Sequence, residues 1–163
     1  MPEYRRARVP GGTYFFTLRL ARPGGDALTE RIDVLRAVYV RCAREHPFRT
    51  DAIVVLPDHL HAVWTLPEGD ADFSMRWMRI KAAFAREVGT RPRSASKVRK
   101  REAGLWQRRF FERCVRDEAE LAACLRYVWC NPVKHGYVER AADWPWSSVH
   151  REIGAGRLPP EGP

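Results

Sequence analysis

The stretch DAIVVLPDHLHAVWTL, residues 51–66, is the part of the sequence that decides the fold. It contains two apolar runs rich in β-branched residues, 51–56 and 59–66, and such runs are typical of strands. Only Pro57 and Asp58 separate them. Because parallel strands need a crossover of a dozen or more residues, we expect these two strands to pair antiparallel.

The sequence on either side of this pair predicts more strands and helices, interspersed along the chain. The expected strands are 13–18 and 106–115, and the expected helices are 29–44, 72–88 and 117–130. Thr29 is the expected cap of the first helix, and Pro132 is expected to end the last, because the residue before proline avoids the α region. We therefore expect a single α+β domain over residues 1–156, a small antiparallel sheet with packed helices, and a frayed tail at 157–163.

Length and composition narrow the class of protein. The chain has 163 residues, enough for one domain with a core, and 45% of them are hydrophobic, which excludes a wholly disordered chain. No apolar run reaches the length of a membrane span, and the first residues lack the apolar stretch of a secretory signal, so we expect a cytoplasmic protein. The four cysteines show no Cys-x-x-Cys spacing, which favours reduced thiols over a structural zinc site.

Positive charge is concentrated in one segment. The chain carries 29 Lys and Arg against 20 Asp and Glu, and residues 86–116 alone hold 11 basic and three acidic residues. This balance indicates a polyanionic partner, first of all nucleic acid, although a solvated basic loop is the ordinary alternative. We expect a mobile basic loop at about 89–104. The candidate nucleic-acid contacts are Arg91, Arg93, Lys97, Arg99, Lys100, Arg101, Arg108 and Arg109 in this segment, and Lys134 beyond it.

Two short patterns carry side chains able to do chemistry. His59 and His61 lie two apart on an expected strand, so both project from one face and could bind one divalent cation. Tyr127 and Asn131 lie four apart, on one face of the last expected helix. Taken alone, both patterns also suit ordinary structural residues, so neither of them defines a mechanism.

Five blocks of sequence, in the same order, resemble the REP-associated tyrosine transposases, relatives of the small single-tyrosine insertion-sequence transposases. The blocks are PGGTYFFT at 10–17, VLPDHLHAVW at 55–64, WQRRFFE at 106–112, YVWCNPVKHGYV at 127–138 and WPWSS at 144–148. The resemblance extends from about residue 4 to residue 156, nearly the whole chain, and is far more specific than the His-Leu-His triplet alone.

The resemblance implies a HUH-type nuclease fold, which is ferredoxin-like or RRM-like, with a nucleophilic tyrosine. His59 and His61 match the two motif histidines, and Tyr127 matches the nucleophile. Asn131 stands where relatives place a third metal ligand, commonly glutamine in the insertion-sequence enzymes, and the implied cofactor is Mg²⁺ or Mn²⁺. Trp129 departs from the family, which often has histidine there, but it lies off the face of Tyr127.

The implied activity is cleavage and rejoining of single-stranded DNA at REP-type hairpins through a 5′-phosphotyrosine. A divalent cation would neutralise the anionic phosphodiester that the tyrosine attacks. The alternatives are a non-catalytic nucleic-acid-binding domain with the same fold, and a hydrolytic metallonuclease that uses water. The expected partner is single-stranded or hairpin DNA rather than a membrane or a small-molecule substrate, and both monomer and homodimer remain open. His135 could approach the site or contact DNA, and Trp106 could stack on unpaired DNA or pack in the core.

Overall fold

The structure is a computed structural model that describes residues 7–89 and 104–163. Its elements, in chain order, are β1 (Thr13–Arg19), α1 (Ala27–Glu30), α2 (Ile32–Glu45), β2 (Arg49–Val55), β3 (His59–Thr65), α3 (Phe73–Val88), β4 (Phe111–Cys114), α5 (Glu118–Lys134), the 3₁₀ helix η1 (Ala141–Asp143) and α6 (Val149–Gly154).

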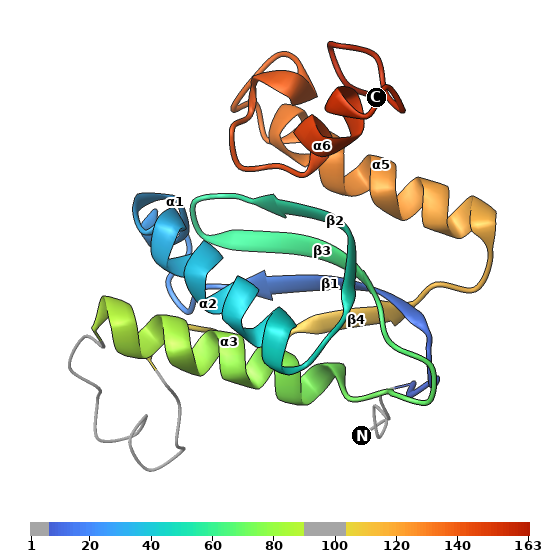
Figure 1. The fold of residues 1–163 in the computed structure, drawn as a ribbon. Helices are drawn as coiled ribbons and strands as arrows, with labels where there is room; N and C mark the ends of the chain where they lie inside the picture. The colour runs from blue at the N-terminus through green and yellow to red at the C-terminus, as the bar shows by residue number, and fades with distance from the viewer. Residues whose placement is uncertain (1–6, 90–103) are drawn as a thin grey trace, which may run out of the picture.

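The strands form one four-stranded antiparallel sheet in the order β2-β3-β1-β4, so the expected α+β architecture is confirmed. The strands expected from residues 51–66 are β2 and β3, and they pair antiparallel with Val55 opposite Leu60. Helices α2 and α3 cover one face of this sheet, and α5 with the C-terminal segment covers the other (Figure 1).

Side chains alternate between the two faces and build a core on each. Phe16 and Trp64 point toward α2 and α3, where the ring of Trp64 stacks on Trp77 at a centroid distance of 3.9 Å. On the other face Phe15 and Val63 pack with residues of α5 and the C-terminal segment. The alternation follows from the two-residue period of a strand, and it places every second residue of β3 beneath α5.

The expected strand at 106–115 is wrong in its first half. Trp106 makes only an isolated bridge to Leu20, and the strand begins at Phe111. Two carbonyls between these points, those of Gln107 and Arg108, accept hydrogen bonds from the Lys81 ammonium of α3 instead of a ladder partner. Arg108 and Arg109 therefore do not lie on a strand as expected.

The expected helix boundaries need two corrections. The helix expected at 29–44 divides at Arg31 into α1 and α2, and the hydroxyl of Thr29 donates to the Asp26 carbonyl instead of capping a helix. Helix α5 continues through Pro132 to Lys134, because a proline removes only one backbone donor and Gly136, with φ of 73°, supplies the actual end.

The C-terminal tail, expected to fray, lies against η1. The Glu161 carbonyl accepts a hydrogen bond from the Ala142 amide at 3.3 Å, and Gly162 is buried.

Most of the expected basic loop lies outside the described residues, and so do Arg91, Arg93, Lys97, Arg99, Lys100 and Arg101. No helix in the described part of the chain has the length and apolar character to cross a bilayer. All four cysteines are free.

Candidate active site

The His59 and His61 rings lie side by side on the face of β3 that is turned toward α5. Their centroids are 5.1 Å apart, and each residue is only 2% exposed. Burial of two imidazoles in an otherwise apolar interior is costly unless their nitrogens are satisfied.

One nitrogen of each ring has a side-chain partner. His59 Nδ1 lies 2.7 Å from Asp58 Oδ1, and the other oxygen of that carboxylate accepts a hydrogen bond from the Gly24 amide. His61 Nδ1 lies 2.8 Å from the Thr17 hydroxyl on β1. The carboxylate can only accept, so His59 carries its proton on Nδ1 and presents a bare Nε2. Neither Nε2 atom has a hydrogen-bond partner among the described residues.

Both rings are held in the neutral form that binds metal ions. Burial lowers the pKa of His59, although its bond to Asp58 opposes the shift. Burial, and next the charge of His59, lower the pKa of His61 to about 3. Neutral imidazoles offer their Nε2 lone pairs as ligands without having to lose a proton first.

Helix α5 and its C-cap residue His135 place three side chains, each four residues from the next, opposite this pair. The Tyr127 ring lies 5.3 Å from the His61 ring, and the His135 ring lies 5.1 Å from the His59 ring. Asn131 stands between them on the same helix face. It is 1% exposed, and its amide oxygen and nitrogen have no hydrogen-bond partner within the described residues. The predicted residues His59, His61, Tyr127 and Asn131 therefore meet in one place.

This donor set fits a divalent cation. Two neutral imidazole nitrogens and an amide oxygen are buried without hydrogen-bond partners among the described residues, and both atom types ligate divalent metals. No three His, Cys, Asp or Glu side chains gather into a metal-binding cluster in the described ranges, so Asn131 would have to complete the site. Imidazole ligands favour Mn²⁺ over Mg²⁺, which prefers an all-oxygen shell.

Tyr127 combines a fixed ring with access to solvent. Its ring packs edge-on against Phe15 at 5.6 Å, yet the residue is 41% exposed. Lys134, one of the predicted DNA contacts, places its ammonium 4.9 Å from the centre of the same ring. A large substrate can therefore reach the Tyr127 hydroxyl beside the histidine pair.

The other predicted residues lie farther from this cluster. Arg108 and Arg109 are exposed on the segment before β4, and no contact with the histidines or Tyr127 is seen for them. Trp106 is 3% exposed and packs against Phe84, so it belongs to the core. Trp129 donates its indole N–H to the Ser148 hydroxyl, away from the face of Tyr127.

Three residues of the site were missed at the level of sequence. Thr17 and Asp58 hold the two imidazoles, and Arg19 lies directly opposite His59 in the β1–β3 register. The charge of Arg19 also contributes to the lowered pKa of both histidines. Alternation along β1 places Thr17 and Arg19 on one face, but only the strand register shows that this face carries the histidines.

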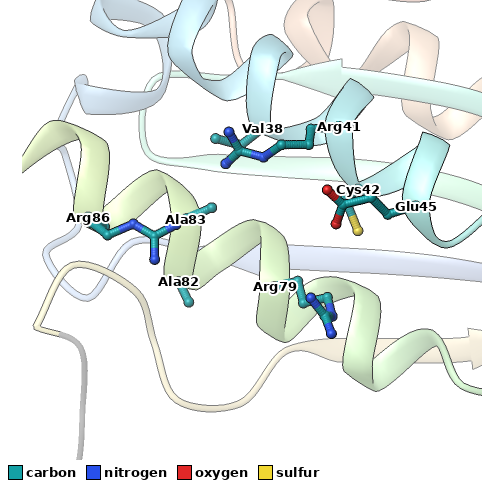
Figure 2. A pocket seen from close by; sticks show the side chains of 8 residues that line it. All are labelled: Val38, Arg41, Cys42, Glu45, Arg79, Ala82, Ala83 and Arg86. Carbon is teal, nitrogen blue, oxygen red and sulfur yellow. The ribbon is translucent and has the colours of Figure 1, made fainter.

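A separate pocket of about 320 Å³ lies between α2 and α3 (Figure 2). These two helices cover the face of the sheet opposite to the one that carries α5 and the histidines. Arg41, Arg79 and Arg86 project around it, with Glu45 as the one acidic residue of its lining. It contains none of the predicted catalytic residues, but it adds positive charge to a second face of the molecule.

Comparison with known proteins agrees with this geometry. No family model matches the chain. The REP-associated tyrosine transposase of Escherichia coli strain K12 is 40% identical over 159 residues, which is 98% of this chain and 89% of that protein. A putative REP-associated tyrosine transposase of Haemophilus influenzae is 44% identical over 157 residues, 95% of this chain and 89% of that protein.

A solved structure extends the comparison to three dimensions. The structure of a REP-associated tyrosine transposase bound to a REP hairpin superposes with a TM-score of 0.90 at 39% identity, covering 100% of this chain and 92% of that one. Fold, site and relatives together define the chain as a transposase, an enzyme that acts on DNA. It belongs to the family of the REP-associated tyrosine transposases.

Proposed function

We propose that the chain binds REP-type hairpin DNA and cleaves and rejoins the adjacent single strand through a covalent phosphotyrosine, with a divalent cation as cofactor. The observation that supports this most directly is the exposed Tyr127 ring, 5.3 Å from a buried imidazole whose Nε2 has no partner among the described residues. A nucleophile at the rim of a buried donor set is the arrangement that phosphodiester transfer requires.

The proposed step needs no reactant other than the DNA and the tyrosine. The Tyr127 oxygen, as phenolate, attacks the phosphorus; the new bond is P–O(Tyr), and the bond to the 3′-oxygen breaks. The phenolic proton leaves to solvent, and the departing 3′-oxygen takes up a proton to become a 3′-OH. Because the phosphotyrosine is itself a diester, a 3′-OH can reverse the step and rejoin the strand without ATP.

The protein residues contribute orientation and charge. When bound by His59, His61 and Asn131, a divalent cation supplies Lewis-acid neutralisation of the scissile phosphate. Lys134 is positioned to hold a phosphate beside Tyr127, given its ammonium 4.9 Å from that ring. Phe15 packs edge-on against the Tyr127 ring and limits its motion.

The covalent step can be tested with an end-labelled oligonucleotide that carries a hairpin and a single-stranded flank, incubated with Mn²⁺. We expect wild-type protein to form an SDS-resistant adduct and Tyr127→Phe to form none, while hairpin affinity stays nearly unchanged because only one hydroxyl is lost. Tyr137→Phe is the matched control, since it removes the hydroxyl of another exposed tyrosine near the site.

The same assay separates the competing functions. If wild-type protein cleaves without forming an adduct, and Tyr127→Phe cleaves as well, the protein is a hydrolytic metallonuclease. Binding without any cleavage by wild-type protein would indicate a non-catalytic DNA-binding domain. Either result would contradict the proposed nucleophile.

Metal dependence has its own test. His61→Ala should lose cleavage and Mn²⁺ binding but keep most hairpin affinity, because affinity comes from many phosphate contacts and the metal acts on one. Cleavage should stop in EDTA and return when Mn²⁺ is added. Isothermal titration with Mn²⁺ gives a measure independent of activity, and EDTA-insensitive cleavage would refute the metal site.

A further inference from the structure

Exposed aromatic side chains in the described ranges gather at the active site and nowhere else. Seven large hydrophobic residues in the described ranges are exposed, and the three aromatic ones are Phe111, Tyr127 and Tyr137. Tyr127 is explained by its proposed role as nucleophile. Phe111, 55% exposed, and Tyr137, 46% exposed, have no role in the chemistry derived above.

A continuous series of ring contacts connects these two residues to the site from opposite sides. Phe111 packs on Phe15 at 6.2 Å, and Phe15 packs on Tyr127. On the other side the His135 ring lies 5.1 Å from His59 and 6.0 Å from Tyr137.

The sheet order shows that these sides are opposite edges of the site. Phe111 lies on β4, one edge strand, where it pairs with Thr17 of β1. Tyr137 stacks on Trp144, whose indole N–H donates to the Val55 carbonyl on β2, the other edge strand. The histidines lie on β3 between these edges.

Both rings are fixed in place although they are exposed. Tyr137 stacks on Trp144 at 5.2 Å with an interplanar angle of 28°, and its amide donates to the Pro132 carbonyl. Phe111 is held by the β1–β4 ladder and by its edge-on contact with Phe15. A ring that is already immobilised loses little entropy when a flat partner stacks on it.

From this placement we propose that Phe111 and Tyr137 are two base-stacking platforms, one for an unpaired nucleotide on each side of the scissile phosphate. The inference rests on the proposed function and assigns its single-stranded substrate to a surface. Aromatic side chains bind unpaired bases through stacking that tolerates any sequence, whereas bases inside a duplex stem have no free face to offer. Arg19, opposite His59, and Lys134, beside Tyr127, supply cations for the phosphates of the same strand.

The test measures binding without metal, in the Tyr127→Phe background, so that no cleavage is needed. Fluorescence anisotropy compares a bare hairpin with the same hairpin carrying unpaired flanks. Phe111→Ala and Tyr137→Ala should each weaken binding of the flanked DNA by about 5-fold to 100-fold, the range of base–aromatic stacking, and leave the bare hairpin unaffected. Phe111→Tyr and Tyr137→Phe keep the ring and should bind normally. Met78→Ala removes an exposed apolar side chain from α3 and serves as control.

Abasic nucleotides identify the bases involved. A single abasic position on one side of the cleavage point should weaken wild-type binding and have no further effect in Phe111→Ala. An abasic position on the other side should weaken wild-type binding and have no further effect in Tyr137→Ala.

The inference is overturned if no abasic position matters, or if both alanine variants bind flanked DNA like the parent. Failure of the phosphotyrosine chemistry is seen separately, as a missing adduct in protein with Tyr127 intact. A ring surface used by a partner protein instead would leave all these DNA affinities unchanged and would overturn the inference as well.

Discussion

Thr17 and Asp58 determine how the two imidazoles are presented. Each contacts a Nδ1 atom, at 2.8 and 2.7 Å, and so leaves the Nε2 atom of that ring without a hydrogen-bond partner among the described residues. Residues behind a ligating histidine fix its tautomer and its ring orientation. The Gly24 amide in turn holds the Asp58 carboxylate in place.

Removal of either partner should therefore weaken metal binding without touching a ligand. We expect Asp58→Ala and Thr17→Val each to lower Mn²⁺ affinity by about 10-fold to 100-fold, measured by isothermal titration. Asp58→Asn keeps an accepting oxygen and Thr17→Ser keeps the hydroxyl, so both should restore part of the affinity. Equal Mn²⁺ binding by Asp58→Ala and wild-type protein would show that Asp58 has only a structural role.

At this same scale, the sequence predicts which residues share a face more reliably than which faces meet. The two-residue period of a strand and the four-residue spacing of a helix place His59 with His61, and Tyr127 with Asn131. Their roles as ligands and nucleophile remain predictions. Arg19 could not have been placed from sequence, because its position opposite His59 depends on a register between two strands that lie far apart in the chain.

Among the elements, α3 is anchored at its start by a buried cation. Arg76 is 2% exposed and donates to the carbonyls of His46, Pro47 and Asp72 and to the carboxylate of Asp70. These bonds join the beginning of α3 to the connection between α2 and β2. Asp70 is the residue that supplies negative charge to this buried guanidinium.

Asp70→Asn should destabilise the fold by about 1–3 kcal/mol, because it replaces a charge-assisted hydrogen bond and leaves the buried cation uncompensated. The hydrogen bond from Arg76, and next the Asp72 amide, lower the pKa of Asp70. A lowered pKa gives stability that is present above the ordinary value and is lost as the pH falls below about 4. Urea denaturation from pH 7 to pH 3 should therefore show a smaller acid loss in Asp70→Asn than in wild-type protein.

The control for this variant is Asp143→Asn, which breaks an exposed pair with Arg140. Exposed pairs contribute little to stability, so its free energy of unfolding should change by less than about 1 kcal/mol. If the two variants were equally stable, burial of Arg76 would not determine the strength of its pair with Asp70.

Elements were predicted well where local pattern and tertiary packing agree. The tight break at Pro57 and Asp58 predicts the β2–β3 pair, because chain geometry leaves no alternative. Prediction failed where a distant contact decides the structure. Lys81 of α3 takes the carbonyls of Gln107 and Arg108 out of the expected strand. The end of α5 was misplaced for a local reason instead: a proline removes only one backbone donor, and Gly136 ends the helix.

Across the whole molecule, positive charge is less confined than the sequence count over residues 86–116 suggests. Arg41, Arg79 and Arg86 surround the pocket between α2 and α3 (Figure 2), and no ion pair is seen for them with any described residue. Three other exposed arginines are neutralised locally: Arg49 pairs with an aspartate, as does Arg140, and Arg157 pairs with a glutamate. The surface that remains free to attract a polyanion therefore includes this helical face.

This difference between free and paired arginines gives a prediction for DNA affinity. The triple variant Arg41→Gln, Arg79→Gln and Arg86→Gln should weaken hairpin binding at low salt, and the slope of log affinity against log salt should become shallower by about 0.9 for each duplex phosphate that the variant no longer neutralises. The matched control removes the same formal charge from cations that acidic neighbours already neutralise, so its slope should change less; it combines Arg49→Gln, Arg140→Gln and Arg157→Gln.

Single-turnover cleavage at saturating DNA should stay normal in the first variant, because its arginines lie across the sheet from Tyr127. Anisotropy titrations at several salt concentrations decide the question, and equal slopes for both variants and wild-type protein would mean that the α2–α3 arginines do not contact DNA.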